Sequence, residues 1–285
     1  NMETTLFNIR LPRILAVLLV GGGLSIAGAA YQGMFKNPMV SPDILGASAG
    51  AGFGACLAML MELPTVYVQM FSFCGGILAV FIAATATRRF SMDPILGLVL
   101  GGMMVSTLFQ SGTSTIKLLA DADNKLPQIT FWLMGSFNVM NKAKLFSILI
   151  PVGAGFLILF LVRWQLNVLS FGEDEASSLG IKTKRIRSMV IIASTLITAS
   201  CVSVCGMVGW VGLVIPHAGR ALAGPDYRRL LPICAILGST FLLLVDDVAR
   251  TAFMVELPIG ILTSFIGVPF FMFIFKSGVN KGGSA

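Results

Sequence analysis

Residues 10–54 read RLPRILAVLLVGGGLSIAGAAYQGMFKNPMVSPDILGASAGAGFG, and this stretch decides the fold. After Arg13 the next charged residue is Lys36, so an unbroken run of small and apolar side chains separates the two. A helix that crosses a bilayer needs about 20 mostly apolar residues. We therefore predict a membrane-spanning helix over residues 12–35 and a second one over residues 44–61.

The same character extends along the whole chain. Of its 285 residues, 56% are hydrophobic and 12% are charged, about half the charged fraction of an ordinary soluble domain, and the mean hydropathy is +0.89. Nine apolar runs are candidate spans, at residues 12–35, 44–61, 66–87, 94–119, 145–164, 188–206, 211–223, 230–249 and 259–275. The sequence therefore predicts an all-α, polytopic helical bundle of about nine transmembrane helices, with residues 1–285 as a single transmembrane domain.

The basic residues lie mostly in short loops between the apolar runs, which is typical of topology signals. If the first run starts outside, thirteen lysines and arginines lie on the cytoplasmic side and seven on the outer side. This bias predicts a multi-pass inner-membrane protein with a cytoplasmic C-terminus. It also accounts for the net charge of +7, so we expect membrane lipid around the chain and no nucleic acid.

Glycines recur at helical spacing in two of the runs. Gly46, Gly50 and Gly54 repeat every four residues, as do Gly97 and Gly101. Lipid provides no hydrophobic drive for helices to associate, and close backbone approach through small residues takes its place. We predict that both sets are helix-packing contacts in a compact bundle.

The polar segment 165–187 lies on the predicted cytoplasmic side. Its three acidic residues, 173–175, are followed by apolar positions at helical spacing and then by four basic residues. This pattern predicts short amphipathic helices on the membrane surface. Either a docking platform for a soluble partner or a solvated loop would have this composition, which does not decide between them.

The common motifs of nucleotide binding and of zinc-dependent hydrolysis are missing. The sequence contains neither a phosphate-binding G-x-x-x-x-G-K-[ST] nor H-E-x-x-H, so we expect no enzyme, no cofactor and no metal in this chain. Cys201 and Cys205 lie one helical turn apart with no further ligand nearby, which favours packing over metal binding. His217, the only histidine, follows Pro216, and we expect it to cap a short helix; haem ligation or a proton relay is the alternative.

Five blocks of the sequence carry a family resemblance. They are residues 10–54, FWLMGSF (131–137), LSFGEDEASSLGI (169–181), GWVGLVIPHAGRALAGPDYRRLLP (209–232) and DDVARTAFMVELPIGILTSFIGVPFF (246–271). Together they closely resemble the permease subunits of type II ABC importers, the family that takes up iron–siderophore complexes, haem and cobalamin. The blocks cover nearly the whole chain and occur in the family's order.

The resemblance implies an architecture, a cargo and a location in the cytoplasmic (inner) membrane of a prokaryote. Such permeases have ten helices, with RLPR before the second, which implies that the first is absent from this sequence. Two copies form a homodimer around the translocation path. Two separate ATP-binding cassette subunits, which bind ATP and Mg²⁺, dock below, and a periplasmic or lipoprotein substrate-binding protein docks above. The implied cargo is an iron chelate, for which we favour a ferric siderophore; haem and cobalamin are the alternatives.

The resemblance also assigns site residues. Arg10, Arg13 and Arg250 correspond to basic residues that pair with acidic residues of the binding protein, to which arginine's planar fork is suited. Alternatively, Arg10 and Arg13 extend to lipid head groups, and Arg250 pairs within its own helix with Asp246 or Asp247.

Two further sets of residues follow from the resemblance. The segment 165–187 becomes the cytoplasmic coupling loop that seats in the ATPase subunit, and its docking residues are Glu173, Asp174, Ala176, Leu179 and Gly180. The run 94–119 matches the path-lining fifth helix, on which Met103, Met104 and Ser106 are candidate path residues. Methionine there has two interpretations, cargo coordination and flexible packing.

Two other classes of protein compete with this interpretation. A proton-coupled secondary transporter needs ionisable residues in mid-membrane, but Asp43, Asp246 and Asp247 all lie near predicted span ends. An intramembrane enzyme needs a nucleophile paired with a base, and His217 has no evident serine partner.

Overall fold

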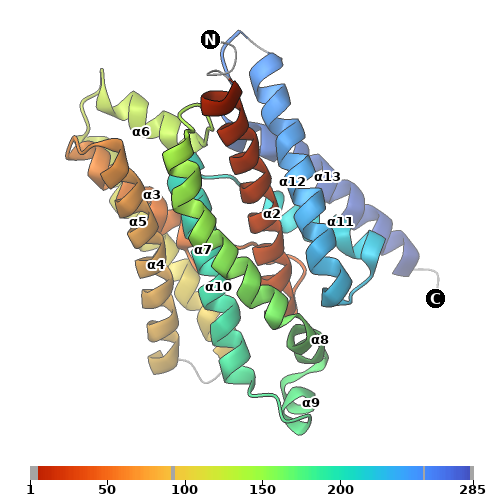
Figure 1. The fold of residues 1–285 in the computed structure, drawn as a ribbon. Coiled ribbons are helices and arrows are strands. Elements are labelled where there is room, and N and C mark those ends of the chain that lie inside the picture. The colour runs from red at the N-terminus through yellow and green to blue at the C-terminus, as the bar shows by residue number, and fades with distance from the viewer. Residues whose placement is uncertain (1–5, 91–93, 253, 283–285) are drawn as a thin grey trace.

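A computed structural model describes residues 6–90, 94–252 and 254–282, and within these ranges the chain is helical without any strand. The all-α prediction is therefore confirmed (Figure 1). The elements are η1 (Leu6–Arg10), α2 (Leu11–Met34), α3 (Ala47–Leu60), α4 (Thr65–Phe90), α5 (Pro94–Leu119), α6 (Lys125–Met134), α7 (Lys142–Leu161), α8 (Arg163–Phe171), α9 (Glu173–Ser178), α10 (Thr183–Cys205), α11 (Val211–Ala223), α12 (Tyr227–Thr251) and α13 (Ile259–Gly282).

Each of the nine apolar runs corresponds mainly to one helix of the structure, and only the run 145–164 extends into a second helix, α8. Among the described residues, six helices are long and apolar enough to cross a membrane, namely Leu6–Met34, Thr65–Thr87 of α4, Ile95–Leu119 of α5, and the helices α7, α10 and α12. The other three runs form shorter apolar helices, Ala47–Leu60, Val211–Ala223 and Ile259–Met272. An α-helix satisfies its own backbone hydrogen bonds, which is what a bilayer demands of any chain that crosses it.

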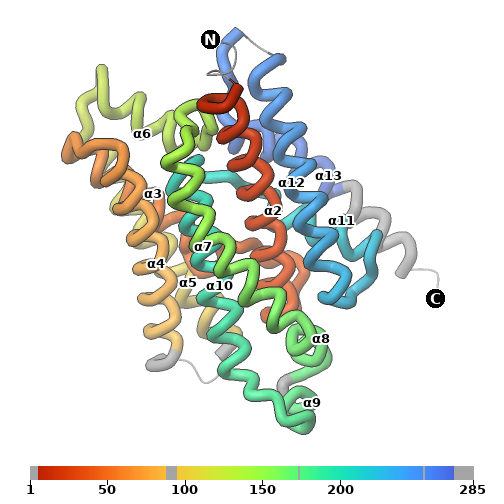
Figure 2. Tube along the Cα trace, viewed as in Figure 1, coloured from red at the N-terminus to blue at the C-terminus, as the bar shows by residue number. Residues whose placement is uncertain are grey.

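Helices α2 and α10 form the centre of the bundle (Figure 2). The most apolar windows of these two helices are 78% and 72% buried, against 28–33% for the other four candidate spans. Small residues allow this position, because a Cβ at Gly28 would overlap the carbonyl oxygen of Gly212 in α11. A Cβ at Gly21 would likewise overlap the carbonyl oxygen of Gly238 in α12.

The glycines that the sequence singles out have two kinds of role. Gly50 and Gly54 lie where α3 meets α4, and a Cβ at either would overlap a backbone carbonyl of α4. Gly46 instead precedes α3 with a left-handed φ of +83°, a conformation that costs glycine little. On α5, Gly97 is buried, and a Cβ at Gly101 would lie 3.0 Å from the carbonyl oxygen of Ala83.

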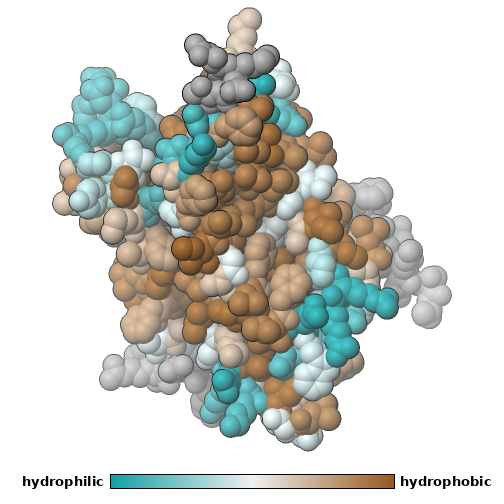
Figure 3. Space-filling model, viewed as in Figure 1, coloured by the Kyte–Doolittle hydropathy of each residue, from teal (hydrophilic) through white to brown (hydrophobic). Residues whose placement is uncertain are grey.

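The surface has the distribution expected of a protein surrounded by lipid. Figure 3 shows a brown, hydrophobic face over the middle of the molecule, with hydrophilic residues gathered at the upper left near α6 and toward the lower ends of α11 and α12. On α7, Phe146 is 63% and Ile150 is 79% exposed. Exposed aliphatic and aromatic side chains in such numbers require an apolar solvent.

Candidate functional site

In the first turn of α2, an arginine binds two carboxylates from remote parts of the chain; Figure 1 shows this end of α2 at the top of the bundle. Arg13 Nη2 lies 2.7 Å from Asp246 Oδ1, and its Nε lies 3.1 Å from Asp246 Oδ2. Its Nη1 donates to Glu256 Oε2 at 3.3 Å. Arg13 is 8% exposed and Asp246 is fully buried, so this ion pair is a structural element of the α2–α12 contact.

The other two predicted docking arginines lie on the surface. Arg10 ends η1 and is exposed. Arg250 is exposed, with its Nε 3.5 Å from Asp246 Oδ2, and it also forms an ion pair with Asp247. The pairing within the helix that the spacing allowed is thus present. The docking of a binding protein by these three arginines stays a prediction. Arg10 and Arg250 are accessible to such a partner, whereas Arg13 is enclosed.

At the opposite end, the segment 165–187 contains the short helices that its pattern predicts. These are α8 and α9, which lie below the bundle in Figure 1. Ala176 is fully buried, whereas Asp174 is exposed and the Leu179 side chain is 66% exposed. Gly180 follows with a left-handed φ of +77°. The Glu173 side chain lies outside the part of the chain that the structure describes.

One residue of this segment joins it to the membrane helices. Asn167 in α8 donates from Nδ2 to Asp226 Oδ1 at 2.5 Å and accepts from the backbone N–H of Tyr227 at 2.7 Å. Asp226 caps α12 by accepting from the N–H of Arg228 at 2.9 Å. These bonds, first that from Arg228 and then that from Asn167, lower the pKa of the Asp226 carboxyl. Sequence reasoning missed this contact, although an aspartate before an apolar helix is a cap signal.

The predicted path residues lie on an outward-facing side of α5. Met103 and Met104 are 58% and 74% exposed, and Ser106 is half-buried beside Gly46. Farther along the same helix, Thr107, Ser111 and Thr115 are exposed and each hydroxyl donates to the carbonyl four residues earlier. This face is therefore polar in part, yet its hydroxyls are satisfied without water.

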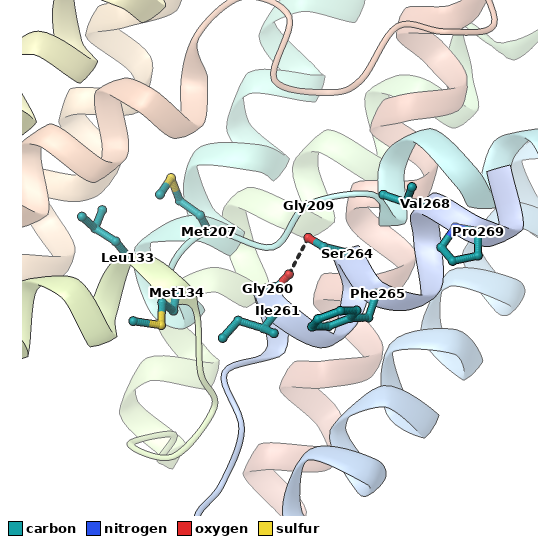
Figure 4. Close-up of a pocket in the computed structure, with 10 residues that line it drawn as sticks. All are labelled: Leu133, Met134, Met207, Gly209, Gly260, Ile261, Ser264, Phe265, Val268 and Pro269. Atoms are coloured by element: carbon teal, nitrogen blue, oxygen red, sulfur yellow. Dashed lines mark hydrogen bonds between the residues drawn. The ribbon is translucent and has the colours of Figure 1, made fainter. Parts of the chain in front are cut away.

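A pocket of about 710 Å³ opens between the end of α6, the segment after α10 and the first turns of α13 (Figure 4). It is lined by Leu133, Met134, Met207, Gly209, Gly260, Ile261, Ser264, Phe265, Val268 and Pro269, none of which is charged. Its one side-chain hydroxyl, on Ser264, donates to the carbonyl of Gly260 at 2.8 Å. The sequence did not predict this pocket, because its walls are ordinary membrane residues brought together from three segments.

The histidine prediction needs correction. His217 lies in the middle of α11, since the helix runs from Val211 to Ala223 with Pro216 inside it, so His217 does not cap the helix. Its ring lies 6.2 Å from that of Phe271 in an edge-on arrangement. Among the described residues, no three His, Cys, Asp or Glu side chains are grouped so as to hold a metal.

Residues 46–50 spell G-A-S-A-G, the letters of a hydrolase nucleophile motif. That motif requires a strand before the serine. Ser48 instead lies in the first turn of α3, after a loop, and its N–H donates to Asp43 Oδ1 at 2.6 Å. In this chain the G-x-S-x-G letters therefore mark the start of helix α3 and not a nucleophile site.

Comparison with known proteins gives a consistent family. A family model described as the FecCD transport family matches residues 1–277. The chain is 40% identical over 284 residues to the molybdate import system permease protein MolB of Haemophilus influenzae, covering 99% of this chain and 83% of that protein. It is 37% identical to the cobalamin import system permease protein BtuC of Halobacterium salinarum, covering 94% of this chain and 72% of that protein.

A solved structure has the same fold. It is an inward-facing conformation of a metal-chelate type ABC transporter, and it superposes with a TM-score of 0.91 at 39% sequence identity. The superposition covers 96% of this chain and 88% of that one. Over the superposed part the two chains share their helix arrangement.

Proposed function

This chain belongs to the FecCD transport family and is a membrane-embedded permease subunit of an ABC importer, and on that basis we propose that it carries an iron chelate, preferably a ferric siderophore, across the cytoplasmic membrane. It is a transport protein and not itself an enzyme. Haem and cobalamin remain the alternative cargoes within this proposal.

The uncharged pocket supports an organic chelate as the cargo. Its wall contains Met134, Met207 and Phe265 and no ionised side chain. We propose that cargo passes this pocket, because such a surface tolerates the amphipathic shell of a chelate and holds it weakly enough to release it. Haem and cobalamin share an organic shell, so the pocket favours this class of cargo and not one member of it.

Molybdate is a second candidate, because a relative with 40% identity is a molybdate import permease. A small oxyanion prefers N–H donors or cations. The residues that line the pocket present neither as side chains, which is why we place molybdate second.

We propose that the working assembly contains two copies of this chain, two ATP-binding cassette subunits and a substrate-binding protein. The outward face of α5, with Met104 74% exposed, is available to line a path between the two copies. In the predicted coupling loop, Leu179 is 66% exposed and Asp174 is exposed too, so this loop is suited to a groove on the ATPase. Arg10 and Arg250 are accessible to acidic residues of the binding protein.

Reconstitution tests this function. Vesicles that contain the permease, its ATPase subunit and its binding protein should accumulate cargo when ATP is inside. Uptake should stop with vanadate and survive a protonophore. Replacing Glu173 and Asp174 with lysine should separate ATP hydrolysis from uptake. Accumulation by vesicles that contain this chain as their sole protein would refute the proposal.

The cargo is tested separately. The purified binding protein of the same system is incubated with a ferric siderophore, haem, cobalamin and molybdate, and bound ligand is identified by mass spectrometry. Retention of the siderophore supports the favoured cargo. Retention of molybdate alone would refute the iron-chelate assignment and leave the importer assignment intact.

A further inference from the structure

The Asn167 contact is the first part of a polar chain that runs through the lower end of the bundle. Asn167 bonds both to the cap residue of α12, Asp226, and to the first N–H of that helix, on Tyr227. Donor and acceptor atoms of a single amide are thus both used. The geometry fixes α8 and the start of α12 against each other in two directions.

The chain continues from α12 into α11 and α2. Tyr227 is buried, and its side chain interacts electrostatically with the guanidinium of Arg220 in α11. Arg220 in turn donates to Gln32 Oε1 in α2. Gln32 is 3% exposed, and its Nε2 donates to the carbonyls of Val40 and Leu213 at 3.1 and 3.3 Å. Four helices therefore meet in one polar network that begins in the predicted coupling loop, residues 165–187.

Helix α12 then carries this connection to the other end of the molecule. Its middle is held against α2 where Gly21 and Gly238 meet, and Ser239 Oγ donates to the carbonyl of Leu18 at 2.6 Å. Its upper end holds Asp246 against Arg13. Residues 226 and 246 are roughly 30 Å apart along a helix that rises about 1.5 Å per residue.

The first turn of α12 depends on Asn167 more than an ordinary helix start would. Pro232 lies inside α12 and has no N–H to donate to the carbonyl of Arg228. The first turn therefore lacks one of the bonds that would tie it to the rest of its helix. The side chain of Asn167 supplies an anchor from outside.

We propose that Asn167 is a positioning residue for transport, which joins the coupling loop to α12. Displacement of α8 by a partner ATPase would then move the α2–α12 pair. This rests on the proposed importer function. Asn167 touches neither cargo nor nucleotide, and it acts through Asp226 and Tyr227.

The contact of Asn167 with α12 is tested on the full chain in lipid nanodiscs, without any partner. Hydrogen exchange at the amide of Tyr227 should quicken in Asn167→Ala by about 3- to 10-fold, the ratio that corresponds to one ordinary hydrogen bond. The double variant Asn167→Asp with Asp226→Asn exchanges donor for acceptor. It should restore slow exchange, because the new amide at position 226 donates to the new carboxylate. Asn167→Asp alone, which places two carboxylates together, should not restore it.

Asn141→Ala is the matched control. Asn141 caps α7 at the opposite end of the molecule by accepting from the N–H of Lys144 at 2.9 Å. Its loss removes a comparable bond but should leave exchange at Tyr227 unchanged.

The role in transport is tested in the reconstituted importer, as cargo moved per ATP hydrolysed. Asn167→Ala should lower this ratio by a factor of the same order as its effect on exchange, whereas the swapped pair and Asn141→Ala should keep the wild-type ratio. A merely structural role would lower uptake and hydrolysis together and leave the ratio unchanged, which would overturn the proposal.

The two tests separate this inference from the function on which it rests. Unchanged hydrogen exchange at Tyr227 in Asn167→Ala refutes the proposed anchoring of α12 by Asn167, even when the wild-type importer works. A wild-type assembly without ATP-driven uptake refutes the importer function, and with it the coupling role.

Discussion

Asp246→Ala removes the carboxylate that faces Arg13 inside the α2–α12 contact. The Asp246 side chain is fully buried, and that of Arg13 is 10% exposed. Removing one partner of a buried ion pair costs about 3–5 kcal/mol, because the other charge is left without compensation. Glu256 still lies within hydrogen-bond reach of Arg13, so we expect a loss of unfolding free energy of about 3 kcal/mol, at the lower end of that range.

Two variants set the scale for this value. Asp247→Ala removes a carboxylate whose side chain is 53% exposed in its pair with Arg250, and exposed pairs contribute about 0–1 kcal/mol. Replacing the buried pair as a whole, Arg13→Met with Asp246→Leu, should recover most of the loss, because apolar side chains of similar volume replace buried ion pairs at little cost.

The assay is equilibrium unfolding by SDS in mixed micelles, followed by the fluorescence of the three tryptophans. We expect the unfolding free energy of Asp246→Ala to lie far below that of the wild type and that of Asp247→Ala to lie close to it. The variant with Arg13→Met and Asp246→Leu should lie between the two. Equal losses for Asp246→Ala and Asp247→Ala would refute this expectation, since burial would then make no difference to the ion pair.

Three further predictions use other parts of the molecule. Gly28→Leu should lower the unfolding free energy in the same SDS titration by at least about 1–3 kcal/mol, because the new side chain would collide with the backbone of Gly212. Gly153→Leu should change it little, because a Cβ at Gly153 meets no other atom within 4 Å. Equal losses in the two variants would contradict the close packing of α2. Because the pKa of Asp226 is lowered in the folded state, its contribution to stability is complete above the ordinary aspartate pKa and is lost as the pH falls through the lowered value. The stability difference between wild type and Asp226→Asn, measured from pH 7 to pH 3, should therefore shrink at the acid end, and a constant difference would argue against the cap. Arg10→Glu should slow capture of the binding protein at low salt, and the effect should fade at high salt; surface plasmon resonance at two ionic strengths measures it, and an unchanged association rate would remove Arg10 from the docking surface.

Local sequence pattern predicted the helices well because a bilayer imposes its demand on each segment separately. A run such as 188–206 has to be apolar and helical whatever its neighbours are, and all of it except residue 206 lies within α10. The same holds for the short amphipathic helices in 165–187. It does not hold for His217, whose position inside α11 depends on the helix continuing past Pro216.

The roles of the arginines required the tertiary structure. Arg10 and Arg13 lie one helical turn apart in the same motif, with the same chemistry, and the sequence gives both the same expected role. In the fold, Arg10 is exposed and Arg13 is enclosed by Asp246 and Glu256. Those partners are 233 and 243 residues away along the chain, a separation at which spacing carries no information about contact.

By itself, the amino-acid sequence determined that this protein is a helical membrane permease, since hydropathy and family motifs are properties of consecutive residues. Tertiary structure alone decided which polar groups meet: the ion pair at Arg13, the amide of Asn167 against α12, and the uncharged pocket beside α13. The physical reason is that a span needs only its own composition to be stable in lipid. A buried polar contact instead requires two remote side chains to arrive at the same place, and the packing of the helices between them fixes that place.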